Sequence, residues 1–148
     1  MGVINITPDS FYDGGLYNSE KEVLLQVEKM QNEGATFIDV GAYSSRLNAR
    51  HINEDEELKR ILPIVDLILK AFPKSLLSID TFRSSVAKQC IEAGVCMIND
   101  ISAGQLDENM MATIADLNVP YVMMHLKGTP QTMHQHTDYD NLLKDILF

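Results

Sequence analysis

Five short apolar runs, each followed by a segment with helical periodicity, constrain the fold of this chain more than any other feature of its sequence. Each run is compact and rich in Val, Ile or Met, which is typical of buried parallel strands. The runs span residues 2–6, 36–40, 76–80, 95–99 and 119–125. Strand and helix in unbroken alternation predict a parallel α/β architecture, because each right-handed crossover returns the chain beside the preceding strand. The pattern is compatible with a barrel and with a doubly wound sheet.

The segments between these runs carry the start and stop signals of helices. Ser19 and Glu22 form a capping box before the first helical segment, and Gly34 is placed to end it. Asn53 repeats the start signal before a second segment, which Pro63 is expected to kink or interrupt. Further helices are expected over residues 84–93, over residues 107–117 and from near residue 139 onward. No linker, repeat or low-complexity stretch divides the chain, so residues 1–148 are predicted to form one domain.

Charge and composition narrow the classes of partner. The formal net charge of −9 and the isoelectric point near 4.7 argue against general affinity for nucleic acid or for an anionic membrane surface, both of which require clustered Lys and Arg. The chain opens without a basic, apolar targeting segment, and no apolar stretch approaches about 18 residues, so a cytoplasmic location is expected. Cys90 and Cys96 have no metal-ligand spacing and imply no disulfide framework, which suits a reducing compartment.

Polar residues gather where the predicted strands end. Ligands of parallel α/β proteins bind at the carboxyl ends of the strands, so polar side chains placed there are the informative ones. An unpaired carboxylate or amide costs about 1 to 3 kcal/mol in an apolar interior, so its repetition at five strand ends indicates a single binding site at this edge. The residues concerned are Asn5, Asp39, Asp80, Asn99, Asp100 and His125.

Two loops add to this predicted site. The loop after the first strand is long and rich in turn residues, with Pro8-Asp9 and Asp13-Gly14-Gly15, which is typical of a closing lid. The loop after the second strand, GAYSSRLNARHI, combines the hydroxyl groups of Ser44 and Ser45 with the guanidinium groups of Arg46 and Arg50. Such groups bind phosphate oxygens and supply the local positive charge that an anionic substrate needs in this acidic chain.

Each of these features also has a simpler structural interpretation. Asp9 and Asp13 are common turn residues. Residues 99–100 are compatible with a helix-capping turn. Arg46 and Arg50 are compatible with solvated surface charges.

Two other groups are interpreted structurally. His125, His134 and His136 have no companion carboxylate at a defined spacing, so the sequence does not favour a metal site there. Met123 and Met124 are interpreted as core residues rather than as contacts of a cofactor, because Met commonly fills gaps in cores.

Four motifs, taken in order and spacing, resemble the dihydropteroate synthase family. They are MGVINITPDSFYDGG, IDVGAYSSR, SIDTFRSSVAKQCIEAGVCMINDISAG and MMHLKGTPQTM. The resemblance implies a TIM (β/α)8 barrel, here a partial barrel with about five parallel strands. It also implies a transferase of folate biosynthesis that condenses 6-hydroxymethyl-7,8-dihydropterin pyrophosphate with p-aminobenzoate, giving 7,8-dihydropteroate and pyrophosphate, and that is a target of sulfonamides.

The resemblance also assigns roles to individual residues. Asp80 and Asn99 match pterin-binding residues with a catalytic role, and Ile101 and Met124 match residues that line the pterin pocket. Asn5 matches the residue that reaches the pyrophosphate and a Mg²⁺ ion. The remaining matches are the pyrophosphate contacts Ser45 and Arg46 and the p-aminobenzoate loop residues Thr7, Pro8, Asp9, Ser10, Phe11, Ser44 and Ser45.

Two departures from the family pattern are visible. The second loop of the family usually reads GGESTRPGA, whereas this chain has GAYSSRLNARH, so that Ala42-Tyr43 replaces Gly-Glu. These substitutions fall on the predicted p-aminobenzoate pocket. A (β/α)8 barrel needs about 250 residues, so this chain is expected to be a fragment that is inactive alone. The resemblance implies that the full-length enzyme forms a homodimer.

Two other functions compete with this one. Pterin-binding methyltransferases that act on methyltetrahydrofolate and corrinoids share the barrel and similar Asp and Asn positions. They lack the TPDSF loop and the Ser-Arg pair that this sequence has. A half-barrel that binds a pterin or a partner chain without catalysis is the second alternative, which the short chain and the altered second loop favour.

Overall fold

The computed structural model describes residues 1–6, 20–43 and 51–147 and shows one parallel sheet of five strands. The strands are β1 (Gly2–Asn5), β2 (Phe37–Gly41), β3 (Leu76–Asp80), β4 (Met97–Asp100) and β5 (Tyr121–Met123). They lie in sequential order, β1-β2-β3-β4-β5, and every neighbouring pair is parallel. A doubly wound sheet reverses its strand order at a switch point, and this sheet does not. The predicted partial barrel is therefore confirmed.

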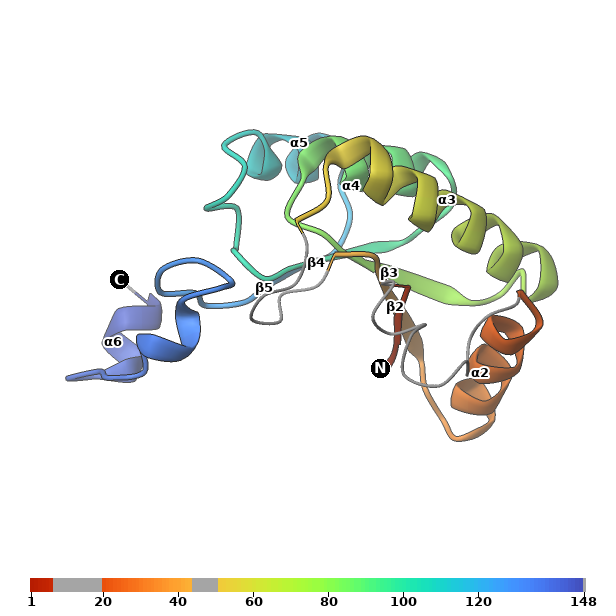
Figure 1. Ribbon diagram of the computed structural model, residues 1–148, viewed down its shortest axis with the longest axis horizontal. Coiled ribbons are helices and arrows are strands. Elements are labelled where there is room, and N and C mark those ends of the chain that lie inside the picture. Colours follow the sequence, from red (N-terminus) through yellow and green to blue (C-terminus); the bar gives the residue numbers. More distant parts are fainter. Residues whose placement is uncertain (7–19, 44–50, 148) are drawn as a thin grey trace.

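The helices cover one face of this sheet. The helices between the strands are α2 (Glu20–Asn32), α3 (Glu54–Ala71), α4 (Ser84–Glu92) and α5 (Met110–Leu117). Figure 1 shows α3, α4 and α5 together along one side of the curved sheet, α2 beside β1 and β2, and the C-terminal helix α6 apart from them. A short 3-10 helix (Met133–Gln135) and α6 (Leu142–Leu147) follow β5. The opposite face of the sheet, which these helices leave uncovered, is the face available to a ligand.

Helix α3 follows its predicted start signal but not its predicted interruption. The Asn53 side chain accepts a hydrogen bond from the backbone N–H of Glu56 at 2.9 Å, as the capping signal predicted. Pro63 lies inside the helix, which runs without a break from Glu54 to Ala71. The expectation that Pro63 would interrupt it is wrong. Ile61 and Val65, on either side of the proline, are fully buried, and this packing offsets a proline penalty of about 3 kcal/mol.

Two other boundaries differ from the sequence prediction. Helix α5 begins at Met110 rather than at Asp107, because the Asp107 carboxylate accepts a hydrogen bond from the backbone N–H of Ser84 at 2.7 Å and so serves the start of α4. Helix α6 begins at Leu142, later than expected. The end of α4 agrees with the prediction, since Gly94 has a φ of +105°, a conformation that favours glycine.

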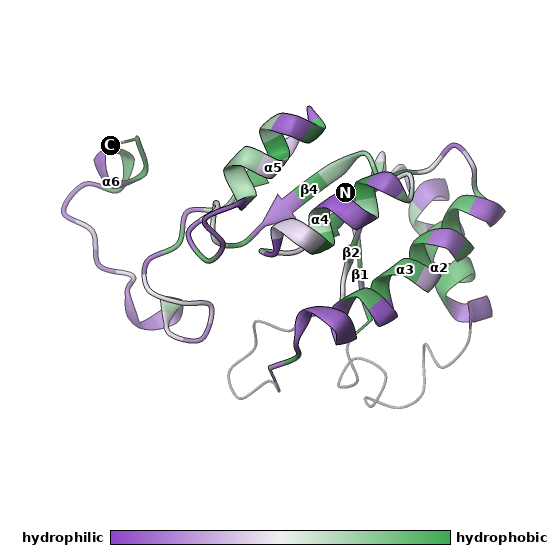
Figure 2. Cartoon of the chain, turned by 90° about the horizontal axis from the view of Figure 1, so that it is seen from above, coloured by the Kyte–Doolittle hydropathy of each residue, from purple (hydrophilic) through white to green (hydrophobic). Residues whose placement is uncertain are grey.

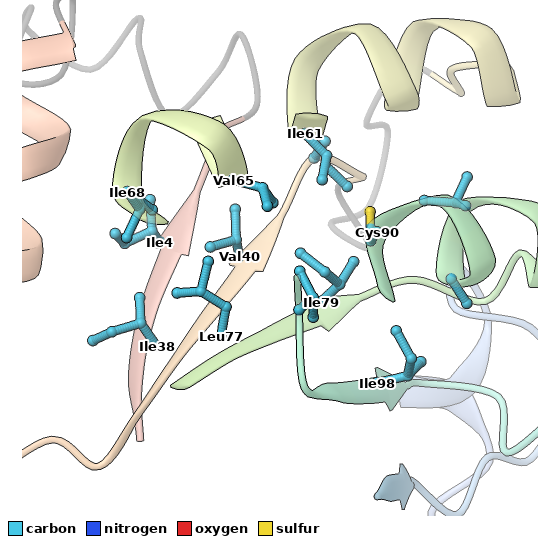
Figure 3. Close-up of a cluster of buried hydrophobic side chains, with 14 of the residues drawn as sticks. Ile4, Ile38, Val40, Ile61, Val65, Ile68, Leu77, Ile79, Cys90 and Ile98 are labelled. Atoms are coloured by element: carbon cyan, nitrogen blue, oxygen red, sulfur yellow. The ribbon is translucent and has the colours of Figure 1, made fainter. Parts of the chain in front are cut away.

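The hydrophobic core lies between the sheet and the helices. Alternate strand residues point to the helices, and the paired positions of neighbouring strands form a continuous apolar layer. Figure 3 shows Ile4, Val40, Ile79 and Ile98 of this layer near side chains from α3 and Cys90 of α4. Figure 2 shows that the helices carry both hydrophobic and hydrophilic residues, as helices that cover one face of a sheet require.

One charged side chain is fully buried in α3. Glu57 is 0% exposed and accepts a hydrogen bond from the Thr81 hydroxyl at 2.7 Å. Its second carboxylate oxygen forms an ion pair with Arg83, which also donates to the backbone carbonyl of Ile52 at 2.7 Å. Burial raises the pKa of Glu57, and the hydrogen bond from Thr81 and the charge of Arg83 counteract that rise. This pair therefore fastens α3 to the loop that follows β3.

We predict that Arg83→Met lowers the free energy of unfolding by about 3 to 5 kcal/mol, because it leaves the Glu57 carboxylate buried without its countercharge. Chemical denaturation measures this loss. Lys70→Ala is the matched control, since Lys70 pairs with Asp66 on the surface and its loss should leave the denaturation midpoint nearly unchanged. Equal midpoints for the two variants would contradict the role assigned to the buried pair.

Candidate functional site

The carboxyl ends of the first four strands place four residues in one row. In the register of the sheet, Asn5 pairs with Gly41, Gly41 with Asp80, and Asp80 with Asn99. Paired residues of neighbouring strands project to the same face, and the residues before them in each strand point to the helices. These four residues, called here the strand-end row, therefore point to the face that the helices leave uncovered. The structure thus brings together three of the residues predicted from the sequence.

Gly41 leaves a space in the middle of this row. A Cβ atom at position 41 would lie 3.3 Å from the Asp80 carboxylate oxygen Oδ2 and 3.5 Å from the Asn5 amide oxygen Oδ1. Both oxygens therefore converge on the position that a side chain would occupy. Amide, carboxylate and phosphate oxygens are the ligands that Mg²⁺ prefers, so the chemistry of this space fits that ion.

Asp39 supports the row from one layer deeper in the sheet. Its carboxylate oxygen Oδ2 accepts a hydrogen bond from the Asn99 side-chain N–H at 3.1 Å, and the side chain is 4% exposed. A carboxylate only accepts, so this bond fixes the Asn99 amide with its nitrogen toward Asp39. Among the described residues, the other carboxylate oxygen of Asp39 and the hydroxyl of Ser78 are buried and have no hydrogen-bond partner. Buried acceptors of this kind point to a ligand that donates.

Asp80 supplies the carboxyl group of the row, and the pKa of this group is raised. Burial, together with the negative charges of Asp39, Glu57 and Asp100, raises its pKa to about 7. A ligand that brings N–H donors or positive charge would favour the ionised form. Perturbed carboxyl groups of this kind cluster at functional sites.

Asp100 has a structural role, unlike its neighbour Asn99. Its carboxylate accepts hydrogen bonds from the backbone N–H groups of Ser102 and Gly104, at 2.7 and 2.8 Å, and from the Tyr121 hydroxyl at 2.6 Å. Asp100 is fully buried on the helix side of β4. Asp100 therefore closes the turn of residues 101–104, whereas Asn99 belongs to the strand-end row. The helix-capping interpretation of residues 99–100 is wrong, because α5 begins only at Met110.

The remaining predicted residues of the described chain lie beside the row. Ile101 directly follows β4 and is half-buried. Met124 directly follows β5, where its backbone N–H donates to the Asp100 carbonyl at 3.0 Å. The interpretation of Met123 and Met124 as core residues is wrong, because their exposed fractions are 57% and 38%. Since β5 lies at an edge of the sheet, these side chains have fewer neighbours than a central strand would give them.

Other expectations fall partly or wholly outside this description. The predicted loop residues lie outside the described residues: Thr7, Pro8, Asp9, Ser10, Phe11, Ser44, Ser45 and Arg46. His125 lies two residues beyond β5, with its ring 5.8 Å from that of Tyr139.

Within residues 1–6, 20–43 and 51–147, no three His, Cys, Asp or Glu side chains come together to hold a metal ion. None of the helices that the structure describes is both long and apolar enough to cross a membrane.

Sequence reasoning missed an aromatic cluster at the same edge. Tyr43, Phe82 and His51 pack edge-on, with ring centroids 5.0 Å apart for Tyr43–Phe82 and 5.7 Å apart for Tyr43–His51. The Arg83 guanidinium lies over the Tyr43 and Phe82 rings. Glu57, which holds Arg83, could have been found from the sequence, because it shares a helical face with the buried isoleucines and valine of α3.

The fold and this edge define a parallel α/β protein of the barrel type that binds a ligand at the carboxyl ends of its strands. Comparison with known proteins makes the class specific: residues 1–147 match the family described as "Pterin binding enzyme". The chain belongs to that family. Its pea (Pisum sativum) relative, "Folate synthesis bifunctional protein, mitochondrial", is 45% identical over 151 residues, and the match covers 99% of this chain and 29% of the relative.

Bacterial relatives and solved structures agree. The dihydropteroate synthase of Haemophilus influenzae is 41% identical, with 99% of this chain and 53% of the relative covered. The Yersinia pestis dihydropteroate synthase, solved with a sulfonamide drug complex, superposes on this chain with a TM-score of 0.86 at 38% identity. The superposition covers 99% of this chain and 52% of the Yersinia pestis chain. This chain therefore spans about half the length of these bacterial relatives.

The raised pKa of Asp80 predicts a pH dependence of stability. The unfolded carboxyl loses its proton near pH 4, about 3 pH units below the folded one, so between these values the folded state binds the extra proton. The free energy of unfolding therefore falls as the pH rises through this window. We expect the advantage of the wild type over Asp80→Asn to fall by about 2 kcal/mol between pH 4 and 7, allowing for partial solvent contact.

Denaturant titrations of the two proteins across this pH range measure the difference. Subtracting the variant removes the contributions of other titrating groups. Parallel curves for the wild type and the variant would contradict the assignment to Asp80.

Proposed function

We propose that this protein is a dihydropteroate synthase, which joins 6-hydroxymethyl-7,8-dihydropterin pyrophosphate to p-aminobenzoate with release of pyrophosphate. The observation that carries the proposal is the strand-end row, in which an amide, a gap at glycine, a carboxyl group of raised pKa and a second amide share one face. The names of the bacterial relatives support it. So does the Xanthomonas albilineans dihydropteroate synthase, solved with 7,8-dihydropteroate, at 30% identity and a TM-score of 0.77.

Asp80 and Asn99 would bind the pterin ring. The ring presents N–H donors, which the Asp80 carboxylate can accept, and the Asn99 carbonyl oxygen remains free because its nitrogen donates to Asp39. Binding of donors would pull the pKa of Asp80 down from about 7 and keep the group ionised. A buried carboxylate close to the reacting carbon would then stabilise positive charge that develops there. Ile101 and Met124, beside the row, are proposed to line the pocket.

Asn5 would lie at the pyrophosphate end of the substrate. Its amide oxygen and the Asp80 carboxylate oxygen border the space at Gly41, and this oxygen-lined space suits a Mg²⁺ ion shared with phosphate oxygens. When bound, Mg²⁺ would neutralise charge on the leaving group. Ser45 and Arg46 are proposed as further pyrophosphate contacts, and residues 7–11 with Ser44 and Ser45 as contacts of p-aminobenzoate.

The reaction needs little covalent chemistry from the protein. The bond between the pterin methylene carbon and the pyrophosphate oxygen breaks, and its electron pair leaves with pyrophosphate. The amine nitrogen of p-aminobenzoate then forms the new bond to that carbon and loses a proton. The residues of the strand-end row contribute by orienting the pterin and by stabilising charge, which are positioning and electrostatic effects.

Further properties of the whole protein remain predictions. We propose small molecules as its substrates, a homodimer as its assembly and the cytoplasm as its location. The pea relative is named as a mitochondrial protein. A pterin-binding methyltransferase and a non-catalytic pterin-binding half-barrel are the alternatives that an assay must separate.

The assay uses the protein at its natural length with Mg²⁺, dihydropterin pyrophosphate and p-aminobenzoate, and measures 7,8-dihydropteroate and pyrophosphate. We expect equal amounts of both products. Asn99→Ala should lower kcat/KM by about 10-fold to 100-fold, because it removes a buried hydrogen-bonding group from the pterin site. Gln89→Ala, which changes an exposed residue of α4, is the matched control and should leave kcat/KM unchanged.

Two results would replace the proposal. Binding of methyltetrahydrofolate in preference to dihydropterin pyrophosphate, without dihydropteroate formation, would assign the protein to the methyltransferases. Binding of the pterin with no product of either kind would support the non-catalytic alternative.

Gly41→Ala tests the space within the row. The added methyl group would lie 3.3 Å from Asp80 Oδ2 and 3.5 Å from Asn5 Oδ1, which is van der Waals contact with both oxygens. It would therefore displace a ligand from the space between them. We expect the Kd for dihydropterin pyrophosphate, measured by calorimetry in the presence of Mg²⁺, to rise about 10-fold.

The control for this variant is Gly34→Ala. Gly34 has a φ of +94° and open space around its Cα, so this change should lower stability through backbone strain and leave the Kd unaltered. An unchanged Kd in Gly41→Ala would show that the ligand does not occupy the space at position 41.

A further inference from the structure

Tyr43 contacts the loops after β3 and β5 and a second residue of its own connection between β2 and α3. It lies two residues beyond the end of β2. Its ring packs perpendicular to that of Phe82, in the loop after β3, at 5.0 Å between centroids. Its hydroxyl lies 3.2 Å from His51 Nδ1, in the segment that leads to α3. The third contact comes from Gln131, whose side-chain N–H donates to the Tyr43 hydroxyl at 3.0 Å.

The bond between Gln131 and Tyr43 joins the loops of two strands that are not neighbours. Gln131 lies in the segment after β5, 88 residues from Tyr43 along the chain. In the sheet, β3 and β4 separate β2 from β5. The bond therefore reaches from one side to the other of the strand ends that carry Asp80 and Asn99. A ligand bound at these strand ends is therefore expected to lie close to this connection.

The two partners of this bond differ in how firmly they are held. The Arg83 guanidinium lies 5.5 Å from the Tyr43 ring centroid and 4.8 Å from that of Phe82, and it is fixed by the buried Glu57. The Tyr43 ring therefore packs against a guanidinium group that the buried ion pair holds in place. Gln131 is exposed and lies in a short turn closed by local bonds between Thr129 and Thr132. Loss of the Tyr43 hydroxyl should release the Gln131 segment rather than the tyrosine.

We infer that Tyr43 is a positioning residue that holds residues 129–135 over the mouth of the site and thereby sets the affinity for the second, arylamine substrate. The inference rests on the proposed function. Tyr43 immediately precedes Ser44, a predicted p-aminobenzoate contact, and stands where the resembled family pattern has glutamate. The pterin end of the site depends on Asp80 and Asn99, which are paired inside the row. The affinity for the pterin substrate should therefore not depend on the Tyr43 hydroxyl.

The first test is Tyr43→Phe in the protein at its natural length. This change keeps the ring and its packing on Phe82 but removes the acceptor for Gln131. We expect the KM for p-aminobenzoate to rise about threefold to tenfold, as the loss of one partly exposed hydrogen bond allows. The kcat and the KM for dihydropterin pyrophosphate should stay unchanged. A purely structural role would instead lower both kcat and the melting temperature.

A double-mutant cycle assigns the effect to the bond itself. Gln131→Ala should raise the KM for p-aminobenzoate by the same factor, and the double variant should show no additional rise, because both changes remove one interaction. Gln89→Ala is the matched control for the loss of an exposed glutamine amide. Hydrogen exchange gives an independent readout: the amides of Thr132 and Met133 should exchange faster in Tyr43→Phe than in the wild type.

The possible failures can be told apart. A wild-type protein that makes no dihydropteroate overturns the proposed function, and the inference that rests on it falls with it. A wild-type protein that makes dihydropteroate, together with an unchanged KM for p-aminobenzoate in Tyr43→Phe, overturns only the inference. Additive effects of the two substitutions, or unaltered exchange at residues 132–133, would likewise show that the bond does not position this segment.

Discussion

The parallel register of the strands is the constraint on which the rest of the structure depends. Because side chains alternate along a strand, the register that buries Ile4, Val40, Ile79 and Ile98 against the helices necessarily turns the strand-end row to the other face. A slip of one residue in any of the first four strands would bury a polar group and expose an isoleucine or valine. The hydrophobic core and the ligand site are thus fixed by the same pairing, and burial of the core positions the site.

Hydrogen-bond satisfaction separates the acidic groups near this edge. The Asp100 carboxylate accepts hydrogen bonds from Ser102, Gly104 and Tyr121, and the Glu57 carboxylate pairs with Arg83. Both groups are therefore structural. Asp39 uses one oxygen to orient Asn99 and keeps the other buried and unpaired. Asp80 has a raised pKa and borders the space at Gly41. The capacity to accept from a ligand is therefore concentrated on the two aspartates that face away from the helices.

Much of the fold could be predicted from the sequence, because strand and helix signals act locally. The five strands and the cap at Asn53 followed from such signals. Pro63 was misjudged because its penalty is local, whereas the packing that offsets it is tertiary. The exposure of Met123 could not be predicted from the sequence either, because the position of β5 at the edge of the sheet depends on the topology of the whole sheet. The bond between Gln131 and Tyr43 joins residues 88 positions apart, and no local sequence pattern predicts it.

The contacts around Tyr43 form layers of decreasing burial. Glu57 is enclosed in the core, Arg83 is mostly buried above it, the tyrosine and Phe82 are half-buried, and Gln131 is exposed. Each inner layer orders the next, because a group held on several sides limits the freedom of the group that packs on it. Changes in the outermost layer remove only one exposed bond and leave the buried pair intact. This arrangement allows the exposed rim to vary while the buried pair and the core stay unaltered. The rim residue Tyr43 is also a position at which this chain departs from the resembled pattern.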